Sequence, residues 1–212
     1  MKSDALRLHA SGLTCERGGR VVFRGLDFEA RGGEALIVTG RNGAGKSSLL
    51  RQIAGLVDIA DGRIVLDGGN PESSLPEQAH YVGHLDALKA AMSVRETAEF
   101  WATYLGGGRI DEALQQLDLA DLADLPVAYL SAGQRRRLAL SRLVLAPRPV
   151  WLLDEPTVAL DRASIARLVA LMEAHLAAGG IIVAATHQDM GLATARSLVL
   201  GPAQDAGEEV PA

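Results

Sequence analysis

The sequence predicts an α/β fold in which a parallel sheet with flanking helices is joined by a small antiparallel β subdomain and a helical lobe. Short, largely apolar runs at residues 35–39, 150–153 and 181–185 are typical of strands buried on both faces of a parallel sheet. Helical patterns alternate with the later runs, as in α/β cores. Strand-like segments bounded by Gly-rich turns flank the first run, which indicates the antiparallel subdomain.

Each element follows from its local pattern. In chain order, strands are predicted at 6–10, 21–28, 35–39, 62–69, 79–82, 150–153 and 181–185, and helices at 48–53, 95–101, 110–117 and 164–178. The pattern is helical from Val94 to Leu145, which predicts a helical lobe at about residues 85–145. Residues 1–200 are expected to form one domain, followed by a polar tail at 201–212.

Composition narrows the class of protein. The chain has 212 residues, 48% of them hydrophobic, and a net charge of −5, which disfavours a nucleic-acid partner. A single cysteine, Cys15, rules out an internal disulfide framework. No apolar run is long enough to span a membrane, and no signal peptide is recognised. We therefore expect a cytoplasmic protein.

The segment GRNGAGKS at residues 40–47 matches the phosphate-binding P-loop pattern G-x-x-x-x-G-K-[ST]. Its glycines let successive backbone N–H groups point at a phosphate, while Lys46 offers a positive charge and Ser47 a hydroxyl for Mg²⁺. A strand precedes it and a helix follows, whose N-terminus favours an anion. The sequence predicts a P-loop NTPase core that binds ATP and Mg²⁺ through Gly40, Arg41, Asn42, Gly43, Ala44, Gly45, Lys46, Ser47 and Ser48.

Two carboxylates follow the apolar run at 150–153. A P-loop site needs an acid at a neighbouring strand end to hold Mg²⁺ through water, and Asp154 suits that position. Glu155 is the next residue and is a candidate for the base that orients and activates water. With Lys46, Glu155 is predicted to be catalytic.

A third motif begins a helix at Ser131. Ser131 and Gln134 stand at the S-x-x-Q spacing of a capping box. The residues that follow, Arg135, Arg136 and Arg137, put positive charge where the helix dipole disfavours it. We interpret this as an indication that an anionic ligand lies nearby.

Together these motifs resemble the ABC-type ATPases over essentially the whole chain. Residues 130–134, LSAGQ, resemble the LSGGQ signature of that family, with Ala132 as the one departure. Residues 159–161 resemble the D-loop that touches the opposite subunit. His187 resembles the switch histidine that contacts the γ-phosphate and is counted as catalytic.

The resemblance implies an assembly as well as an activity. In this family two copies pair head to tail around ATP, and each nucleotide lies between one copy's P-loop and the other copy's signature. Ser131, Gly133 and Gln134 are therefore expected to bind nucleotide held by a second copy of the chain.

Two positions depart from the general pattern of the family. An aromatic residue that stacks on adenine is usual before the second strand, whereas residues 15–19 are Cys-Glu-Arg-Gly-Gly. Arg17 either stacks on the base through its guanidinium plane or is a solvated turn residue. At the Q-loop, His84 follows Gly83 where Pro-Gln is usual. His84 either replaces the glutamine near Mg²⁺ or only serves the loop.

These departures resemble one branch, the haem-exporter ATPases of cytochrome c biogenesis (the CcmA family). That resemblance implies an integral permease subunit like CcmB, with CcmC, CcmD and the haem chaperone CcmE. It also implies attachment to the cytoplasmic face of the inner membrane, with residues 84–95 receiving a helix from the permease. The implied activity is ATP hydrolysis that drives release of the haem-loaded chaperone.

Two other functions remain open at this point. One is an ABC exporter ATPase for a lipid, drug or polysaccharide, because the membrane subunit selects the cargo. The other is a soluble ABC-type switch protein, which the acidic composition and the short distance between Ser47 and Ser131 disfavour.

Overall fold

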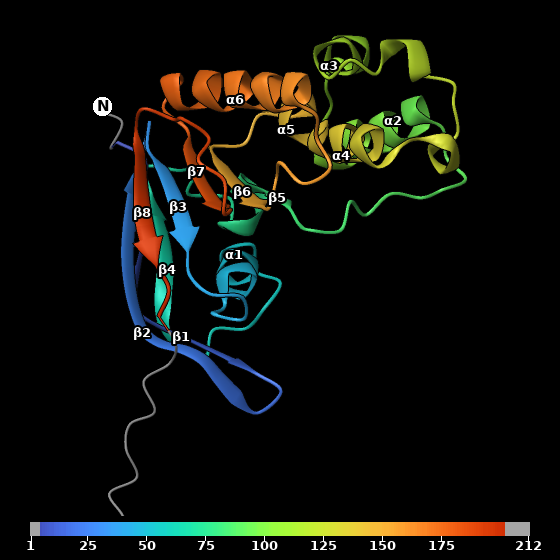
Figure 1. Cartoon of the computed structure of the whole chain (residues 1–212). Coiled ribbons are helices and arrows are strands. Elements are labelled where there is room, and N and C mark those ends of the chain that lie inside the picture. Colours follow the sequence, from blue (N-terminus) through green and yellow to red (C-terminus); the bar gives the residue numbers. More distant parts are fainter. Residues whose placement is uncertain (1–4, 202–212) are drawn as a thin grey trace, which may run out of the picture.

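The computed structural model describes residues 5–201 (Figure 1). Its strands are β1 (Arg7–Arg17), β2 (Arg20–Arg31), β3 (Ala35–Thr39), β4 (Asp61–Asp67), β5 (Ala79–Val82), β6 (Val150–Asp154), β7 (Ile181–Ala185) and β8 (Ala195–Val199). Its α-helices are α1 (Lys46–Ile53), α2 (Val94–Leu105), α3 (Ile110–Gln116), α4 (Ala132–Leu140), α5 (Arg142–Leu145) and α6 (Arg162–Ala177). The predicted tail at 201–212 lies outside the described residues except for Gly201.

The larger sheet has the strand order β5-β6-β7-β3-β8, and every pairing in it is parallel. Alternate residues of its central strands face opposite cores. On β6, Val150 and Leu152 pack against the core around α1, whereas Trp151 and Leu153 pack against the core under α6. Because helices cover both faces, these strands are apolar throughout rather than alternating. The predicted parallel α/β core is confirmed.

The smaller sheet is antiparallel, with the order β2-β1-β4. Helix α1 lies between the two sheets, as Figure 1 shows, and its buried Leu49, Leu50 and Ile53 join one core with residues of both. This sandwich fixes the N-terminus of α1 at the edge of the parallel sheet. The predicted antiparallel subdomain is therefore also confirmed.

Helices α2 to α5 form a cluster with an apolar core of its own at the side of the parallel sheet (Figure 1). Helix α2 opens with a capping box between Ser93 and Glu96 and ends at Gly106, whose φ is 103°. Gly106 is the first of three consecutive glycines, 106–108, which separate α2 from α3.

Some elements differ from the prediction. Strand β8 is missed by the sequence pattern because it lies at the edge of the sheet and most of its residues are exposed. Strand β1 extends to Arg17, well past the predicted end at residue 10, through an irregularity near Gly12. Helix α1 starts at Lys46, two residues before the predicted start. Within residues 5–201, the structure contains no helix long and apolar enough to cross a bilayer.

A buried histidine gives the fold a pH dependence. His80 on β5 is 2% exposed, and its Nε2 lies 2.7 Å from the carbonyl oxygen of Ala146. Burial lowers the pKa of His80 to about 4, with smaller contributions from the charges of Arg148 and Arg142 and against an opposing effect of the hydrogen bond to Ala146. His80 is therefore neutral in the folded chain, and its Nε2–H donates to Ala146.

We predict that acidification destabilises the protein through His80. The unfolded chain takes up a proton near pH 6.5 and the folded chain only near 4, so stability is lost as the pH falls between these values. The loss at pH 5 should be about 2 kcal/mol. Chemical denaturation at pH 7.5 and pH 5 should show a smaller loss for His80→Gln than for the parent. The change His9→Gln, at a half-buried histidine of β1, should keep most of the parental loss. An equal loss in His80→Gln and in the parent would contradict the assignment.

Candidate functional site

The candidate site is a cavity of about 470 Å³ at the edge of the parallel sheet where β6 and β7 end. Loops that follow β3, β6 and β7 all reach it, because the carboxyl ends of parallel strands share one edge. It is lined by Arg17, Val22, Asn42, Gly43, Gly45, Lys46, Ser47, Ser48, Arg51, His84, Asp154, Glu155 and His187. Most of the residues predicted from the P-loop and the β6 end are therefore brought together.

Some of the predicted P-loop residues line the cavity and others support the loop from outside it. Gly40, Arg41 and Ala44 do not line the cavity. The carbonyl oxygens of Gly40 and Arg41 accept hydrogen bonds of 2.9 and 3.3 Å from Lys46 Nζ, while Ala44 packs into the core around α1. The loop thus holds the Lys46 ammonium over the start of α1.

Gly45 is the N-cap residue of α1, with a left-handed φ of 99°. A Cβ there would lie 2.5 Å from Val22 Cγ1 and 2.9 Å from Phe23 Cδ1, so a side chain is excluded by space as well as by backbone conformation. The first N–H groups of α1 consequently open toward the cavity without a side-chain cap.

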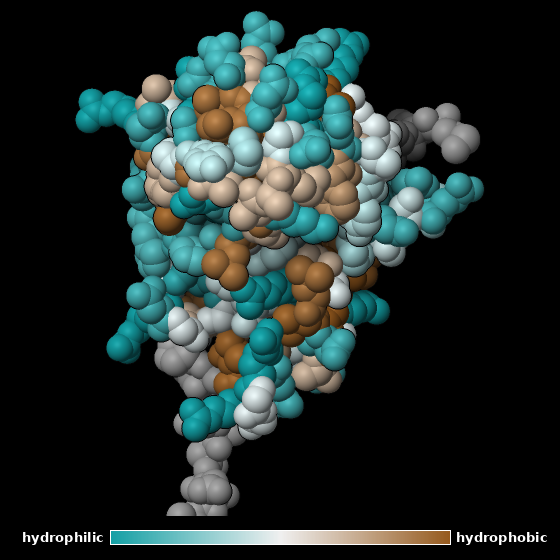
Figure 2. All heavy atoms as spheres, turned by 90° about the vertical axis from the view of Figure 1, so that its right-hand side faces the viewer, coloured by the Kyte–Doolittle hydropathy of each residue, from teal (hydrophilic) through white to brown (hydrophobic). Residues whose placement is uncertain are grey.

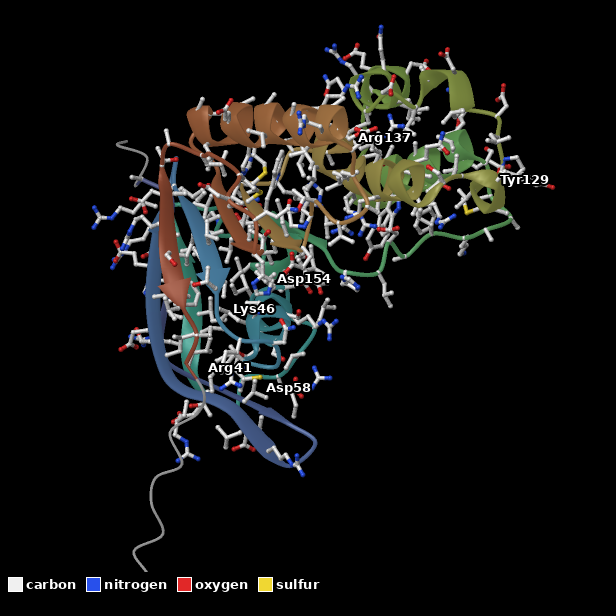
Figure 3. All side chains as sticks on the ribbon, viewed as in Figure 1. Arg41, Lys46, Asp58, Tyr129, Arg137 and Asp154 are labelled. Atoms are coloured by element: carbon white, nitrogen blue, oxygen red, sulfur yellow. The ribbon has the colours of Figure 1, made fainter. Side chains whose placement is uncertain are left out.

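The residues proposed for Mg²⁺ meet at the start of α1. Ser47 Oγ donates a hydrogen bond of 3.1 Å to Asp154 Oδ1. Asp154 is 3% exposed, and its other oxygen, Oδ2, is buried without a hydrogen-bond partner in the structure. A hydroxyl beside a buried carboxylate oxygen that lacks a partner suits a hard divalent cation with oxygen ligands. Figure 3 shows Lys46 and Asp154 next to each other at this edge.

Glu155 and His187 face each other across the cavity. His187 Nε2 lies 3.7 Å from Glu155 Oε1, and the histidine is exposed while the glutamate is half-buried. Glu155 has a φ of 47°, which is unusual for a residue with a side chain. Its N–H donates to the carbonyl oxygen of Ala185 at the end of β7. The carboxylate is thus placed where a water molecule could be activated.

Arg17 and His84 both line the cavity and are both exposed. Arg17 is the last residue of β1, so it belongs to a strand end rather than a free turn. His84 lies just after β5. Their proximity to the P-loop is consistent with a contact to the nucleotide for each, and their roles remain predictions.

The signature residues lie outside this cavity. Ser131 N donates to Gln134 Oε1 at 2.7 Å and Gln134 N donates to Ser131 Oγ at 3.2 Å, so the predicted capping box is confirmed. Gly133 lies so close to the D-loop that a Cβ would be 2.8 Å from the carbonyl oxygen of Ala159. In Figure 3 Tyr129, next to this motif, lies at the far end of the helical cluster from Lys46.

The arginines after the signature have partners within the chain. Arg135 donates to the carbonyl oxygen of Leu130, and Arg137 donates to Leu117 and Asp118. Arg136 is buried and donates to several backbone carbonyls. The interpretation that an anionic ligand accounts for these charges is therefore unnecessary, because carbonyl and carboxylate oxygens of the fold satisfy them.

Two lining residues escaped the sequence analysis. Arg51 donates from Nε to the hydroxyl of Tyr81 at 3.2 Å, and this contact raises the pKa of Arg51. Its position four residues after Ser47 places both on one face of α1, a spacing that could have revealed it. Val22 comes from β2 and has no such signal, since only the packing of the two sheets brings it near Gly45.

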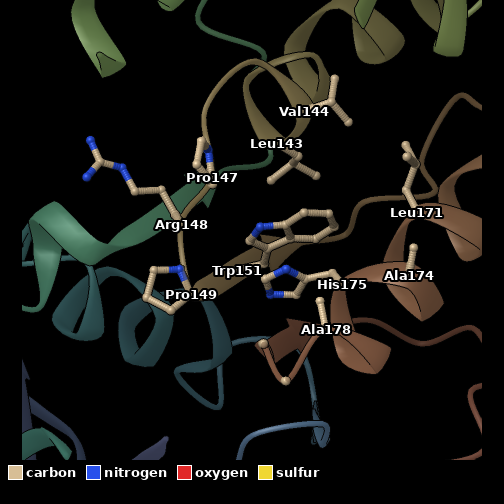
Figure 4. Close-up of a pocket in the computed structure, with 12 residues that line it drawn as sticks. Leu143, Val144, Pro147, Arg148, Pro149, Trp151, Leu171, Ala174, His175 and Ala178 are labelled. Carbon is tan, nitrogen blue, oxygen red and sulfur yellow. The ribbon is translucent and has the colours of Figure 1, made fainter. Parts of the chain in front are cut away.

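A second cavity, of about 550 Å³, lies at the opposite end of the strands (Figure 4). Trp151 and His175 stack there with ring centroids 4.0 Å apart, beside apolar side chains of α5 and α6. Burial lowers the pKa of His175, so it is a neutral packing partner. This cavity has neither the glycine-rich loop nor the carboxylates of the first one.

Comparison with known proteins gives relatives along most of the chain. A family model described as "ABC transporter" matches residues 23–158. A protein of Nitrobacter winogradskyi named "Cytochrome c biogenesis ATP-binding export protein CcmA" is 58% identical over 200 residues, covering 93% of this chain and 100% of the relative. A protein of the same name from Chelativorans is 50% identical, covering 92% of this chain and 98% of the relative.

Solved structures share the fold. A structure described as that of a bacterial Atm1-family ABC exporter with ATP bound has a TM-score of 0.80 at 24% identity, over 95% of this chain and 38% of that chain. An ATP-binding subunit of an ABC transporter has a TM-score of 0.75 at 23% identity, over 85% of this chain and 79% of that chain.

The crowding at Gly45 generates a prediction. Gly45→Ala and Gly12→Ala should each lose roughly 1–2 kcal/mol of stability from backbone strain, because both glycines have a positive φ. Gly12 is the matched control, since its φ is 62° but a Cβ there would meet no other atom within 4 Å. Only Gly45→Ala should also shift the P-loop and weaken ATP binding by at least ~10-fold, about 1.4 kcal/mol. Thermal unfolding and titration with a fluorescent ATP analogue measure the two effects. Equal ATP affinity in both variants would refute the role of this contact.

Proposed function

The chain belongs to the ABC transporter family, among the ATP-binding export proteins of cytochrome c biogenesis, and from this membership we propose that it is the ATP-hydrolysing subunit of a haem exporter complex. The observation that carries the proposal is the meeting of Lys46, Ser47, Asp154, Glu155 and His187 in one cavity. An exporter of a lipid, drug or polysaccharide is disfavoured by the relatives, which are named for cytochrome c biogenesis along nearly their whole length.

The side chains divide the work of hydrolysis. Lys46 and the N–H groups at the start of α1 bind the β- and γ-phosphates of ATP and stabilise charge that builds up there. Ser47 and Asp154 would hold Mg²⁺, which neutralises phosphate charge when it is bound. Lys46 exchanges its bonds to the Gly40 and Arg41 carbonyls for bonds to phosphate as ATP enters.

Glu155 and His187 act on the water and the terminal phosphate. Glu155 accepts a proton from the water that attacks the γ-phosphorus, and the bond from that phosphorus to the bridging oxygen of ADP breaks. His187, which faces the Glu155 carboxylate, orients the attacking water or the γ-phosphate. The 3.7 Å between Glu155 Oε1 and His187 Nε2 supports this shared role.

The separation of the signature from the P-loop supports a dimer. Ser131 and Gly133 lie away from the cavity of their own chain, and Ser131 is exposed. A second copy in head-to-tail orientation would place its Ser131, Gly133 and Gln134 over the nucleotide. Each site would then be complete only in the dimer.

The surface around the segment between β5 and α2 supports a membrane partner. Leu85, on this segment, is 82% exposed. On α2, Tyr104 is 73% exposed and lines a hollow together with Phe100 and with Met92, just before the helix. Figure 2, which views the molecule from the side of the helices, shows hydrophobic residues in several separate groups among polar ones on this face. Large apolar side chains exposed on one side of a protein are typical of a protein interface.

The occupant we propose is a short helix of an integral permease subunit like CcmB. CcmC, CcmD and the haem chaperone CcmE would complete the assembly, and hydrolysis would drive release of the haem-loaded chaperone. The chain would then attach to the cytoplasmic face of the inner membrane through these partners.

A change at Glu155 tests the proposed catalysis. Glu155→Gln removes the proton acceptor without changing the size of the side chain, so the turnover number should fall ~10²–10⁴-fold while ATP binding is retained. Phosphate release measures turnover, and size-exclusion chromatography with ATP should show the variant held as a dimer. Glu173→Gln, an exposed change on α6, should behave like the parent. Parental hydrolysis by Glu155→Gln would exclude this residue as the base.

A change at Leu85 tests the proposed docking to the permease. Leu85→Asp places a charge on the segment proposed to receive the permease helix, so recovery of the chain with the permease from detergent-solubilised membranes should fall at least ~10-fold, about 1.4 kcal/mol. Val199→Asp on β8, where the residue is 70% exposed, is the matched control and should be recovered normally. Recovery of Leu85→Asp at the parental level, or recovery of a sugar or lipid permease with the parent, would count against the assembly.

A further inference from the structure

One guanidinium contacts the loop after β6 at three consecutive residues. Arg136, on α4, has a side chain that is 4% exposed. Its Nη2 donates to the carbonyl oxygens of Asp154 and Glu155, both at 2.9 Å, and its Nε donates to that of Pro156 at 3.3 Å. The backbone on either side of Glu155 is thus fixed by a side chain from the helix that follows the signature.

This loop needs such support because its backbone is strained. Glu155 sits in the left-handed region with a φ of 47°, a strained conformation that persists only where its surroundings enforce it. The bond from Glu155 N–H to Ala185 fixes one side of the peptide, and Arg136 fixes the carbonyls on the other. Loss of either restraint would let the carboxylate turn away from His187.

The other end of the same guanidinium reaches the segment that follows β5. Arg136 Nη1 donates to the carbonyl oxygen of Gly83 at 2.7 Å and to Asp86 Oδ1 at 3.1 Å. Gly83 and Asp86 flank His84 and the exposed Leu85, on the segment proposed to receive the permease helix. One buried side chain therefore contacts both the docking segment and the catalytic loop.

A second arginine anchors the segment without reaching the loop. Arg142 donates to the carbonyl oxygens of Asp86 and Tyr81, at 3.2 and 3.3 Å, and lies 4.1 Å from the centre of the Trp101 ring. Burial and the charge of Arg136 lower the pKa of Arg142 to about 10, and the charge of Asp86 opposes this shift. Asp86 is thus the carboxylate that compensates two buried cations.

We propose that Arg136 is a positioning residue for Glu155 and that Asp86 orients it, so that a shift of the docking segment reaches the catalytic carboxylate through this guanidinium. The coupling to docking rests on the proposed function, whereas the positioning of the loop rests on the contacts alone. An ion pair with a merely structural role would stabilise the whole helical cluster instead of linking these two loops.

The decisive variant is Asp86→Asn, because it is remote from the loop it should affect. Among the described residues Asp86 hydrogen-bonds to Arg136 and Arg142 and not to the loop after β6. Hydrogen–deuterium exchange of the full chain without nucleotide should be at least ~5-fold faster at residues 154–160 as well as at 83–89. Exchange in β7 and α6 should stay at the parental rate.

Arg136→Lys is the second variant, since it keeps the charge but cannot bond four carbonyl oxygens and Asp86 together. For both variants the turnover number in the permease complex should fall at least ~10-fold while the KM for ATP stays within about 2-fold, because the P-loop is untouched. Asp111→Asn is the control, because its exposed carboxylate also pairs with an arginine, Arg95, at 2.8 Å. It should match the parent in exchange and turnover.

Two results would overturn the proposal. In the first, Asp86→Asn speeds exchange at 83–89 but leaves 154–160 unchanged, which would show that the two segments are independent. In the second, exchange rises equally in β7 and α6, which would show a global role in stability. Because exchange is measured without ATP, a parent that failed to hydrolyse ATP would refute the proposed function while the exchange result still decided the positioning.

Discussion

The hydrogen bond from Ser47 Oγ to Asp154 Oδ1 joins two residues 107 positions apart, and the candidate site is arranged around it. Ser47 lies on the first turn of α1 after β3, and Asp154 is the last residue of β6. They meet because all strands of the larger sheet run in one direction and end at one edge. That arrangement requires helices on both faces, which is why the central strands are buried and why α1 lies between two sheets.

The helical cluster is connected to the segments that follow β5 and β6 by buried arginines as well as by apolar contact. Burying a guanidinium is costly unless its donors are satisfied. Arg136 and Arg142 meet this requirement mainly with backbone carbonyl oxygens of the segments that follow β5 and β6. Such bonds specify the path of those segments more closely than packing would, and both segments border the candidate site.

The two groups of residues predicted to bind nucleotide are separated within one chain. The P-loop, the β6 carboxylates and His187 share a cavity, whereas the signature is at a distance and uses its polar side chains to cap α4. An exposed helix N-terminus with a glycine at Gly133 favours an anion brought by another molecule. A second copy, as proposed, would bring its signature to the cavity of the first.

The sequence by itself determined the strands 35–39, 150–153 and 181–185, the P-loop, the carboxylates after β6 and the capping box at Ser131. Each of these is a local pattern, in which a few neighbouring residues carry the full physical signal. Only the tertiary structure shows the edge strand β8 and the approach of Val22 to Gly45. It alone also shows that Arg136 donates hydrogen bonds to backbone carbonyl oxygens at the end of β6. Those features depend on contacts between distant segments. A run of arginines reads the same whether it meets a ligand or the carbonyls of its own fold, and only the packing of α4 against the loop after β6 distinguishes the two.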